Sequence, residues 1–402
     1  MTFPERFASL PEYAFPRLRA LLHGIPAGQS PDITMTIGEP RHPMPGGIAE
    51  ILAAHVRGLA VYPPNDGTPG LLQAIADWAE ARYDIALDPA SQIMALNGTR
   101  EGLFNAVLAL CPETRRGKRP LVLIPNPFYQ VYAVGALAAG AEPVHVPATA
   151  ATGNLPDYAG LPPEVLDRTA LVFVCSPSNP QGAVASRQWW HDLLRLAEKH
   201  DFRILSDECY SEIWRSAPPP GGLELVSEAG VDPERVVVFN SLSKRSNMPG
   251  LRSGFAAGGP QALAAMKRLR AYAGAPLPLP LMAVAEAAWR DEGHVAASRA
   301  LYAAKYAAAD EILAPVRDRM PGYLAPEAGF FLWLPVPETV GDGEAAATRL
   351  WREAGVKVLP GAYLGRTVAG ENPGARYIRV AMVADEGELR EGLTRLVACL
   401  YG

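Results

Sequence analysis

Residues 236–244, VVVFNSLSK, combine an unbroken apolar run with a short polar segment that ends in Lys244. Two other segments have the same form: LVFVCSPSNPQG at residues 171–182 and ILSDECY at residues 204–210. A further apolar run, Leu121 to Ile124, precedes them. Apolar runs that do not alternate with polar residues are typical of strands buried on both faces of a sheet. These segments therefore predict a mostly parallel sheet with polar side chains at the ends of its strands.

Helix-like segments lie between and after these runs. Gln188 to His200 and Pro260 to Tyr272 carry apolar residues at helical spacing, which indicates helices covering the sheet. Such an alternation of strands and helices is typical of α/β architecture. An Ala-rich stretch from His294 to Met320 predicts a helix long enough to join two domains.

The pattern changes after this long helix. Short strands and two helices are expected there, which indicates a smaller α+β domain completed by the N-terminal residues. With 402 residues, the chain is longer than single cores usually grow. We therefore predict a large domain over residues 46–293 and a small domain over residues 1–45 and 294–402. The expected strands are Phe330 to Leu334, Val356 to Leu359 and Tyr377 to Val383, and the expected helices are Glu344 to Ala354 and Glu386 to Tyr401.

Composition and charge exclude several classes of function. A net charge of -5 provides no basic surface for nucleic acid or an anionic membrane. Prolines interrupt the longest low-charge stretch, residues 271–289, so no membrane span is expected. The four cysteines lack C-x-x-C spacing and the seven histidines lack ligand spacing, which argues against a metal site. No secretory signal is recognisable, and we expect a cytoplasmic enzyme that acts on small molecules.

The polar segments supply side chains that one cofactor requires together. Pyridoxal 5′-phosphate (PLP) needs a lysine amine to which its aldehyde bonds, an acid beside its pyridine nitrogen, and donors for its phosphate. Lys244, Asp207 and the hydroxyls of Ser241 and Ser243 match these needs. Each residue alone has an ordinary explanation, such as a helix cap or a solvated surface lysine. The order Asn179, Asp207, Lys244, each at the end of a different strand, resembles that of the fold-type I PLP-dependent aminotransferases.

This resemblance extends from end to end of the chain and implies the fold: a large domain with a mostly parallel sheet flanked by helices, and a smaller α+β domain. It also implies a phosphate site. Gly98-Thr99-Arg100 matches the turn that opens a phosphate-binding helix, here Glu101 to Leu110, and a helix start suits an anion on physical grounds. Arg252 matches the arginine that pairs with the phosphate.

The resemblance assigns further residues to the cofactor. Tyr129 matches an aromatic residue stacked on the pyridine ring, with Phe128 as the alternative. Asn179 and Tyr210 match the groups that hydrogen-bond the phenolic oxygen of PLP. We therefore expect Tyr210 to be a catalytic residue with Lys244 and Asp207, and Asn179 to contact the substrate as well. Tyr62 corresponds to a tyrosine that reaches the phosphate of the neighbouring subunit, which implies a homodimer with shared active sites.

The substrate is expected to be an amino acid or a 2-oxo acid. Arg379 lies in an apolar run, where an arginine is costly without an anion, so we expect it to bind the substrate carboxylate. Gly38, in a Gly-Glu-Pro turn, matches the glycine whose amide approaches the same carboxylate. In the mechanism that the resemblance implies, Lys244 is the general base and Asp207 keeps the ring an electron sink.

A finer resemblance points to one amino donor. The stretches YAFPRL (13–18), PNPFYQ (125–130), SDECYSEI (206–213) and SLSKRSNMPGLR (241–252) are similar to those of bacterial succinyldiaminopimelate aminotransferases. These enzymes exchange N-succinyl-L,L-2,6-diaminopimelate and 2-oxoglutarate for N-succinyl-2-amino-6-oxopimelate and glutamate in lysine and diaminopimelate biosynthesis. The alternatives are an aspartate, aromatic or acetylornithine-type aminotransferase, or a PLP-dependent lyase.

Two points about specificity stay open in the sequence. A long substrate with a distal carboxylate needs an extra cation, and Arg41, Arg100 and Arg245 are equal candidates, with surface solvation as the ordinary explanation of each. Gln181 stands where the family turn commonly carries Thr or Ser before its glycine. We make no prediction about its effect.

Overall fold

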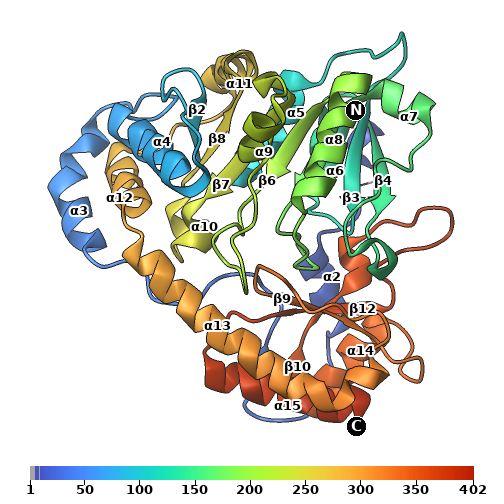
Figure 1. Ribbon diagram of the computed structural model, residues 1–402. Helices are drawn as coiled ribbons and strands as arrows, with labels where there is room; N and C mark the ends of the chain where they lie inside the picture. Colours follow the sequence, from blue (N-terminus) through green and yellow to red (C-terminus); the bar gives the residue numbers. More distant parts are fainter. Residues whose placement is uncertain (1–4, 9) are drawn as a thin grey trace.

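A computed structural model describes residues 5–8 and 10–402 of the chain. Figure 1 shows two lobes, with the long helix α13 (Gly293–Leu313) running diagonally between them. The upper lobe is built on a seven-stranded sheet whose strand order is β2-β8-β7-β6-β5-β3-β4. The strands are β2 Ile93–Leu96, β3 Leu121–Asn126, β4 Glu142–Pro147, β5 Thr169–Cys175, β6 Arg203–Asp207, β7 Val236–Ser241 and β8 Gly254–Gly258.

The sheet is mostly parallel, as expected. Only β8 runs antiparallel to its neighbours β2 and β7. Side chains alternate between two buried clusters along each central strand: Val236 and Val238 pack on one face, and Val237 and Phe239 pack on the other. Burial on both faces explains why these strands are unbroken apolar runs in the sequence.

Helices cover both faces of this sheet. Buried residues of α4, α8, α9 and α12 pack on one face, and those of α5, α6 and α11 pack on the other. The fold class predicted from the sequence is thereby confirmed. The helices of this lobe are α3 Ile48–His55, α4 Pro69–Tyr83, α5 Thr99–Leu110, α6 Val131–Ala138, α7 Pro163–Arg168, α8 Arg187–His200, α9 Gly222–Ala229, α10 Leu242–Arg245, α11 Pro260–Ala273 and α12 Leu279–Arg290.

The lower lobe contains a three-stranded antiparallel sheet of order β11-β12-β9 and a parallel pair, β1 with β10. Helices α13 and α15 pack against these strands in one hydrophobic cluster (Figure 1). The other elements of this lobe are α2 Ala14–Leu21, β1 Ile33–Thr34, β9 Phe331–Pro335, α14 Gly343–Arg349, β10 Val356–Lys357, β11 Leu359–Pro360, β12 Tyr377–Ala381 and α15 Glu386–Tyr401. The short helix α1 (Glu5–Ala8) instead contacts α6 of the upper lobe.

Three elements of this lobe differ from the expectations. The strand expected over Val356 to Leu359 is divided into β10 and β11, which belong to different sheets. The helix expected to reach Met320 ends as an α-helix at Leu313 and continues as a 3-10 helix over Ala314–Arg319. Pro315 explains this change, since proline lacks the N–H that an α-helix uses. The helix expected over Glu344 to Ala354 is α14 followed by a single π-helical turn.

The pairing of β1 with β10 places the N-terminal segment beside the C-terminal strands. The domain boundaries after residue 45 and before residue 294 stay predictions, and residues 1–4 and 9 of the predicted small domain lie outside the described residues. No helix among the described residues is long and apolar enough to cross a membrane.

Candidate active site

One cavity of about 340 Å³ lies at the carboxyl ends of the parallel strands, where open α/β sheets bind their ligands. The three residues that mark the ends of β5, β6 and β7 in the sequence, Asn179, Asp207 and Lys244, all line this cavity. Nine other expected residues also line it. They are Gly38, Thr99, Arg100, Tyr129, Tyr210, Ser241, Ser243, Arg252 and Arg379.

Lys244 lies on α10, the short helix that follows β7. Its Nζ donates a hydrogen bond to the carbonyl oxygen of Gly38 and lies 5.5 Å from the centre of the Phe330 ring. Burial lowers the pKa of the Lys244 amine to about 8. A larger share of this amine is therefore unprotonated near neutral pH than of an exposed lysine, and only the unprotonated amine can attack an aldehyde.

Asp207 ends β6 and is 6% exposed. Its Oδ2 accepts a hydrogen bond of 2.7 Å from the Tyr132 hydroxyl, and its Oδ1 accepts one of 3.4 Å from the Cys209 amide. Burial raises the pKa of the Asp207 carboxyl, and the Tyr132 hydrogen bond opposes that rise. A buried carboxylate held in this way is suited to pair with a protonated ring nitrogen.

Tyr132 received no role in the sequence analysis. It lies on α6, three residues after Tyr129, and its ring stacks on Phe173 with the centroids 4.3 Å apart. This stacking fixes the hydroxyl against Asp207 in the interior. Its helical spacing from Tyr129 could have indicated Tyr132, but a buried tyrosine is usually a packing residue.

A cradle for an anion is formed where α5 begins. Gly98 precedes α5 with a φ of 80°, and a Cβ there would lie 2.3 Å from Arg252 Nη2. Glycine therefore permits the guanidinium of Arg252 to approach the first turn of α5. Thr99 and Ser241 complete the cradle, and their hydroxyls lie 3.2 Å and 3.7 Å from Cys209 Sγ.

Arg379 lies on β12 and is 5% exposed. It donates from Nη1 to Asn179 Oδ1 at 3.0 Å and from Nη2 to the Thr36 carbonyl at 2.8 Å. Its Nε has no hydrogen-bond partner, and no carboxylate lies within salt-bridge distance of it among the described residues. Burial lowers the pKa of Arg379 to about 10. The guanidinium thus presents an uncompensated charge to the cavity.

Three of the aromatic residues that line the cavity were expected from the sequence. Tyr129 accepts a hydrogen bond of 2.7 Å from Arg100 Nε through its hydroxyl. Phe128, the alternative stacking residue, is 1% exposed and also lines the cavity. Tyr210 is buried, and its ring meets the edge of Phe330 at a centroid distance of 5.3 Å.

The remaining candidates lie away from the cavity. Arg41 is exposed and pairs with Glu388, and Arg245 is buried, so of the three arginines proposed for a distal carboxylate only Arg100 lines the cavity. Surface solvation is also wrong for Arg245, which has buried partners. Gln181 is buried and donates to the Ala148 carbonyl.

Tyr62 is 100% exposed and does not line the cavity of its own chain. Its predicted contact with a neighbouring subunit is untested in this single chain.

These residues fit PLP. The amine of Lys244 can bond to the aldehyde, and Asp207 can pair with the ring nitrogen. The cradle of Gly98, Thr99 and Arg252 can hold the phosphate. When bound, PLP supplies an electron sink for charge that develops at the substrate Cα. No group of three or more His, Cys, Asp or Glu side chains that could hold a metal ion is present in the part of the chain that the structure describes.

The fold and this site define a PLP-dependent enzyme of the aminotransferase type. The family described as "Aminotransferase class I and II" matches residues 31–396. The chain therefore belongs to the class I and II aminotransferases, a PLP-dependent family, which confirms the predicted family and cofactor.

Individual relatives cover all or nearly all of the chain. An LL-diaminopimelate aminotransferase of Desulforudis audaxviator is 32% identical over 100% of this chain and 99% of its own length. The crystal structure of an aminotransferase from Neisseria meningitidis is 37% identical with a TM-score of 0.91, covering 100% of both chains. A probable N-succinyldiaminopimelate aminotransferase from Thermus thermophilus is 28% identical with a TM-score of 0.83, covering 96% of this chain and 100% of its own.

Proposed function

We propose that this aminotransferase exchanges N-succinyl-L,L-2,6-diaminopimelate and 2-oxoglutarate for N-succinyl-2-amino-6-oxopimelate and glutamate. The observation that supports a substrate of this kind is the set of cations in the cavity. Lys244, Arg100, Arg252 and Arg379 all line it, and none of them has a carboxylate within 4.0 Å among the described residues. Unpaired cations in one cavity predict ligands with several anionic groups.

Each of the three arginines has a distinct anion in this proposal, and Lys244 is left to react. Arg252 and the first turn of α5 take the phosphate of PLP. Arg379, oriented by Asn179, takes the α-carboxylate of the substrate. Arg100 remains for a second, distal carboxylate, because its Nε donates to Tyr129 while its Nη atoms have no hydrogen-bond partner among the residues that the structure describes. An amino acid with only one carboxylate would leave Arg100 without a partner.

The reacting groups act through this chain's own atoms. Lys244 Nζ would accept the proton from the substrate Cα and hold it for later delivery, and the lowered pKa of this amine favours that role near neutral pH. Asp207, held by Tyr132, keeps a positive charge on the ring nitrogen. Asn179 and Tyr210 line the cavity where they can donate to the phenolic oxygen of PLP.

Free LL-diaminopimelate is the second candidate substrate. It is named in the curated relative from Desulforudis audaxviator, and its distal carbon carries an ammonium as well as a carboxylate. Among the described residues that line the cavity, Glu39 and Asp207 are the carboxylates, so Glu39 is the residue to pair with that ammonium. Succinylation removes the charge of one amino group and adds a carboxylate, which favours Arg100 over Glu39 as the main distal contact.

The test is a comparison of amino donors at equal concentration. Glutamate formation from 2-oxoglutarate is measured with N-succinyl-LL-diaminopimelate, LL-diaminopimelate, acetylornithine, aspartate and an aromatic amino acid. We expect the highest kcat/KM with the succinylated donor, and an Arg100→Gln change to reduce kcat/KM for that donor much more than for a monocarboxylic one. Preference for aspartate or an aromatic amino acid, or release of oxo acid without an acceptor, would reject the proposal.

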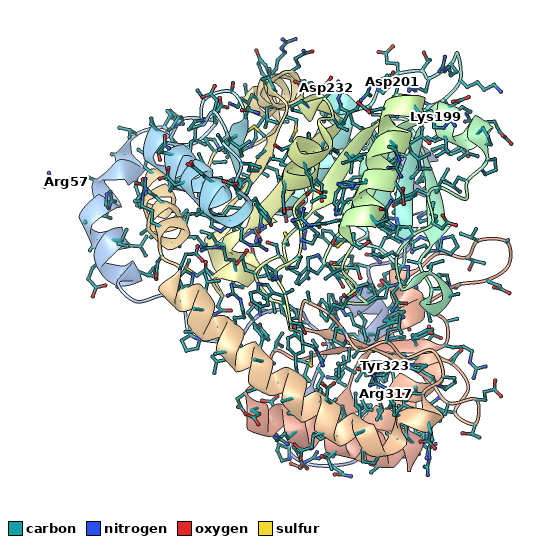
Figure 2. The ribbon with its side chains drawn as sticks, in the orientation of Figure 1. Arg57, Lys199, Asp201, Asp232, Arg317 and Tyr323 are labelled. Atoms are coloured by element: carbon teal, nitrogen blue, oxygen red, sulfur yellow. The ribbon has the colours of Figure 1, made fainter. Side chains whose placement is uncertain are left out.

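We also propose that the enzyme is a homodimer with shared active sites. Exposed apolar side chains between residues 44 and 62 support this: Met44, Val56, Leu59, Val61 and Tyr62 are 53–100% exposed. Figure 2 labels Arg57 of the same segment at the outer edge of the molecule. In the proposed dimer, Tyr62 of each subunit would reach the phosphate site of its partner. The four cysteines are unpaired, which supports the cytoplasm as the compartment.

A further inference from the structure

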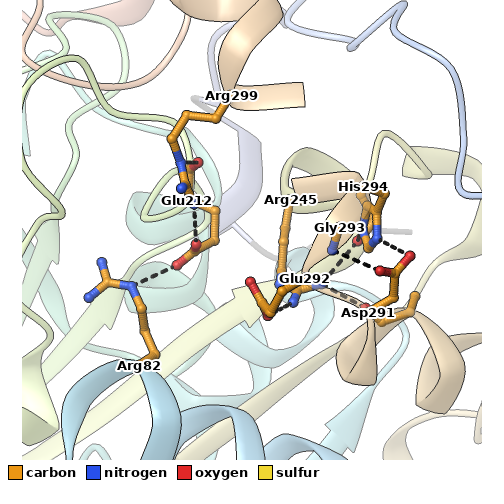
Figure 3. Close-up of polar contacts among 10 residues, drawn as sticks. Arg82, Glu212, Arg245, Asp291, Glu292, Gly293, His294 and Arg299 are labelled. Atoms are coloured by element: carbon orange, nitrogen blue, oxygen red, sulfur yellow. Dashed lines mark hydrogen bonds and ion pairs between the residues drawn. The ribbon is translucent and has the colours of Figure 1, made fainter. Parts of the chain in front are cut away.

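The residue after Lys244 is anchored to the junction between α12 and α13. Arg245 is 2% exposed, although an arginine is seldom buried without partners. Its Nη1 donates to the Ala288 carbonyl at 2.7 Å, and its Nη2 pairs with Glu292 (Figure 3). Helix α10 therefore faces the cavity with Lys244 and the helix junction with Arg245.

The next residue, Ser246, joins a chain of polar side chains at the same junction. Its Oγ lies 2.8 Å from His294 Nε2, and His294 Nδ1 lies 2.9 Å from Asp291 Oδ2. Arg245 Nη1 lies 3.4 Å from Ser246 Oγ on the other side. Figure 3 shows His294 and Asp291 where α13 begins, beside Arg245 and Glu292.

The direction of these hydrogen bonds follows from the charges around the chain. Burial lowers the pKa of His294, so the imidazole is neutral at neutral pH and has one donor and one acceptor nitrogen. The carboxylate of Asp291 can only accept, which places the proton on Nδ1. Nε2 then accepts from the Ser246 hydroxyl, and Ser246 accepts from Arg245. The Ser246 hydroxyl and both ring nitrogens of His294 each have a hydrogen-bond partner in this arrangement.

A serine, a histidine and an aspartate in this order also form the triad of many hydrolases. That role does not suit this group. Ser246 is 0% exposed, and neither Ser246, His294 nor Asp291 lines the cavity. No substrate can reach the serine, so the group can act on the reaction only through the residues bonded to it.

Helix α13 contacts the Asp207 segment as well as the Lys244 segment. Arg299, one and a half turns beyond His294, donates from Nη2 to Glu212 at 3.1 Å, and Glu212 also accepts from Arg82 at 2.9 Å. Figure 3 shows Glu212 between these two arginines. The first turns of α13 are thus bonded to the segments that carry both Lys244 and Asp207.

We propose that the hydrogen-bonded chain Ser246–His294–Asp291 is a positioning device for Lys244, which fixes α10 against the start of α13 and so aims the lysine amine into the cavity. Helix α10 has only four residues and cannot hold its own orientation through helical hydrogen bonds. This inference rests on the proposed role of Lys244 as the attachment residue of PLP.

Two substitutions break the chain at one bond. Ser246→Ala removes the hydroxyl, and His294→Asn keeps an amide near the position of Nδ1 while it removes the acceptor at Nε2. His294→Gln keeps a polar group near the position of Nε2 and is the conservative variant. Arg290→Gln is the matched control, because Arg290 is on the last turn of α12 and its side chain is 45% exposed.

The main readout is the pH midpoint of the absorbance of the lysine-bound cofactor, measured on PLP-loaded protein together with kcat, KM and thermal stability. We expect Ser246→Ala and His294→Asn each to shift this midpoint by about half a unit or more and to lower kcat by about fivefold to tenfold with little change in KM. The double variant should equal either single one, because both remove the same bond. His294→Gln should lie closer to the unaltered enzyme.

The outcomes separate this inference from the proposed function. An unchanged midpoint and kcat in both single variants, even with a lower unfolding temperature, would show a purely structural role and overturn the positioning device. If the unaltered protein shows no lysine-bound absorbance, or Lys244→Ala retains it, the proposed role of Lys244 fails instead. Should His294→Asn fail to fold, Ser246→Ala decides the question alone.

Discussion

We propose that Arg379 binds the substrate carboxylate. Its guanidinium is buried and bonded to Asn179 and Thr36, so it is held in place before any anion binds. We expect Arg379→Lys to raise KM for amino and oxo acids about 10-fold to 100-fold, because a hydrogen bond to a charged group contributes about 1.5–3 kcal/mol and lysine lacks the planar fork. Steady-state kinetics test this.

The control for this change is Arg376→Lys. Arg376 precedes the same strand, but its side chain is 50% exposed and pairs only with exposed Glu338. Its replacement should leave KM within about twofold, since surface ion pairs contribute little. Equal KM values for Arg379→Lys and the unaltered enzyme would mean that another residue binds the carboxylate.

The lowered pKa of Lys244 predicts how the stability of the cofactor-free protein depends on pH. Its folded-state value of about 8 lies below the ordinary 10.5, so the protonated amine destabilises the fold. This penalty is fully present below pH about 8 and decreases as the pH rises from about 8 to 10.5, because the unfolded chain then binds more protons than the folded one. We expect cofactor-free Lys244→Met protein to be more stable than unaltered protein at pH 7, with an advantage that shrinks above pH 8.

Thermal unfolding of the two cofactor-free proteins from pH 6 to pH 10 measures this difference. The comparison isolates Lys244, because other titrating groups such as Lys305 are present in both proteins. A constant difference across this range would show that the amine is not depressed by burial.

Prediction from sequence succeeded best for residues whose chemistry is unusual in their setting. An arginine within an apolar run and a lysine after a buried strand were recognised, and both line the cavity. Tyr132 was not recognised, because a tyrosine in a buried helix is usually a packing residue. Only the structure shows that its hydroxyl donates to Asp207. Arg245 was a candidate for the distal carboxylate, but it does not line the cavity. The sequence does not show which side of α10 each residue faces.

At the scale of elements, Glu212 connects its own segment after β6 with helices α4 and α13 through ion pairs. Its carboxylate, with a side chain 3% exposed, binds Arg82 of α4 and Arg299 of α13. We expect Glu212→Gln to destabilise the protein by about 3 kcal/mol, because it leaves two partly buried guanidiniums without a counter-charge. The exposed pair of Arg290 is the comparison, and Arg290→Gln should cost less than about 0.5 kcal/mol.

Thermal unfolding of both variants checks this expectation. Similar unfolding temperatures for Glu212→Gln and Arg290→Gln would show that the buried pairs of Glu212 are no stronger than a surface ion pair. The link between α4, the Asp207 segment and α13 would then not depend on charge.

Predicting elements from the sequence was reliable for buried strands and for strongly periodic helices. It failed where the choice of pairing strand determines how a segment is divided into strands. The run from Val356 to Leu359 has the composition of one strand, yet its two halves pair with β1 and with β12. Composition does not encode the neighbour that a strand finds. Strands β2, β4 and β8 were also not recognised, because they are short or lie towards the edges of the sheet.

At the scale of the whole molecule, the exposed Tyr62 predicts an active site built from two subunits. Co-expression of Tyr62→Ala and Lys244→Ala chains tests this, since a mixed dimer would have one site with both changes and one with neither. We expect recovery to about a quarter of normal activity, because random pairing makes half of the dimers mixed and each has one intact site.

Each variant expressed alone is the control and should be much less active than the mixture. If the mixture is no more active than the average of the two variants, Tyr62 does not act across an interface. Sedimentation of the unaltered protein as a monomer would reject the shared site directly.

The attachment of PLP to Lys244 is the claim on which the other roles depend. Reduction of the PLP-loaded protein with borohydride, followed by mass spectrometry of its peptides, locates the cofactor on one residue. We predict the label on Lys244 and none in Lys244→Ala protein. Label on another lysine, such as the buried Lys305 whose pKa is also lowered to about 8, or no label at all, would contradict the account.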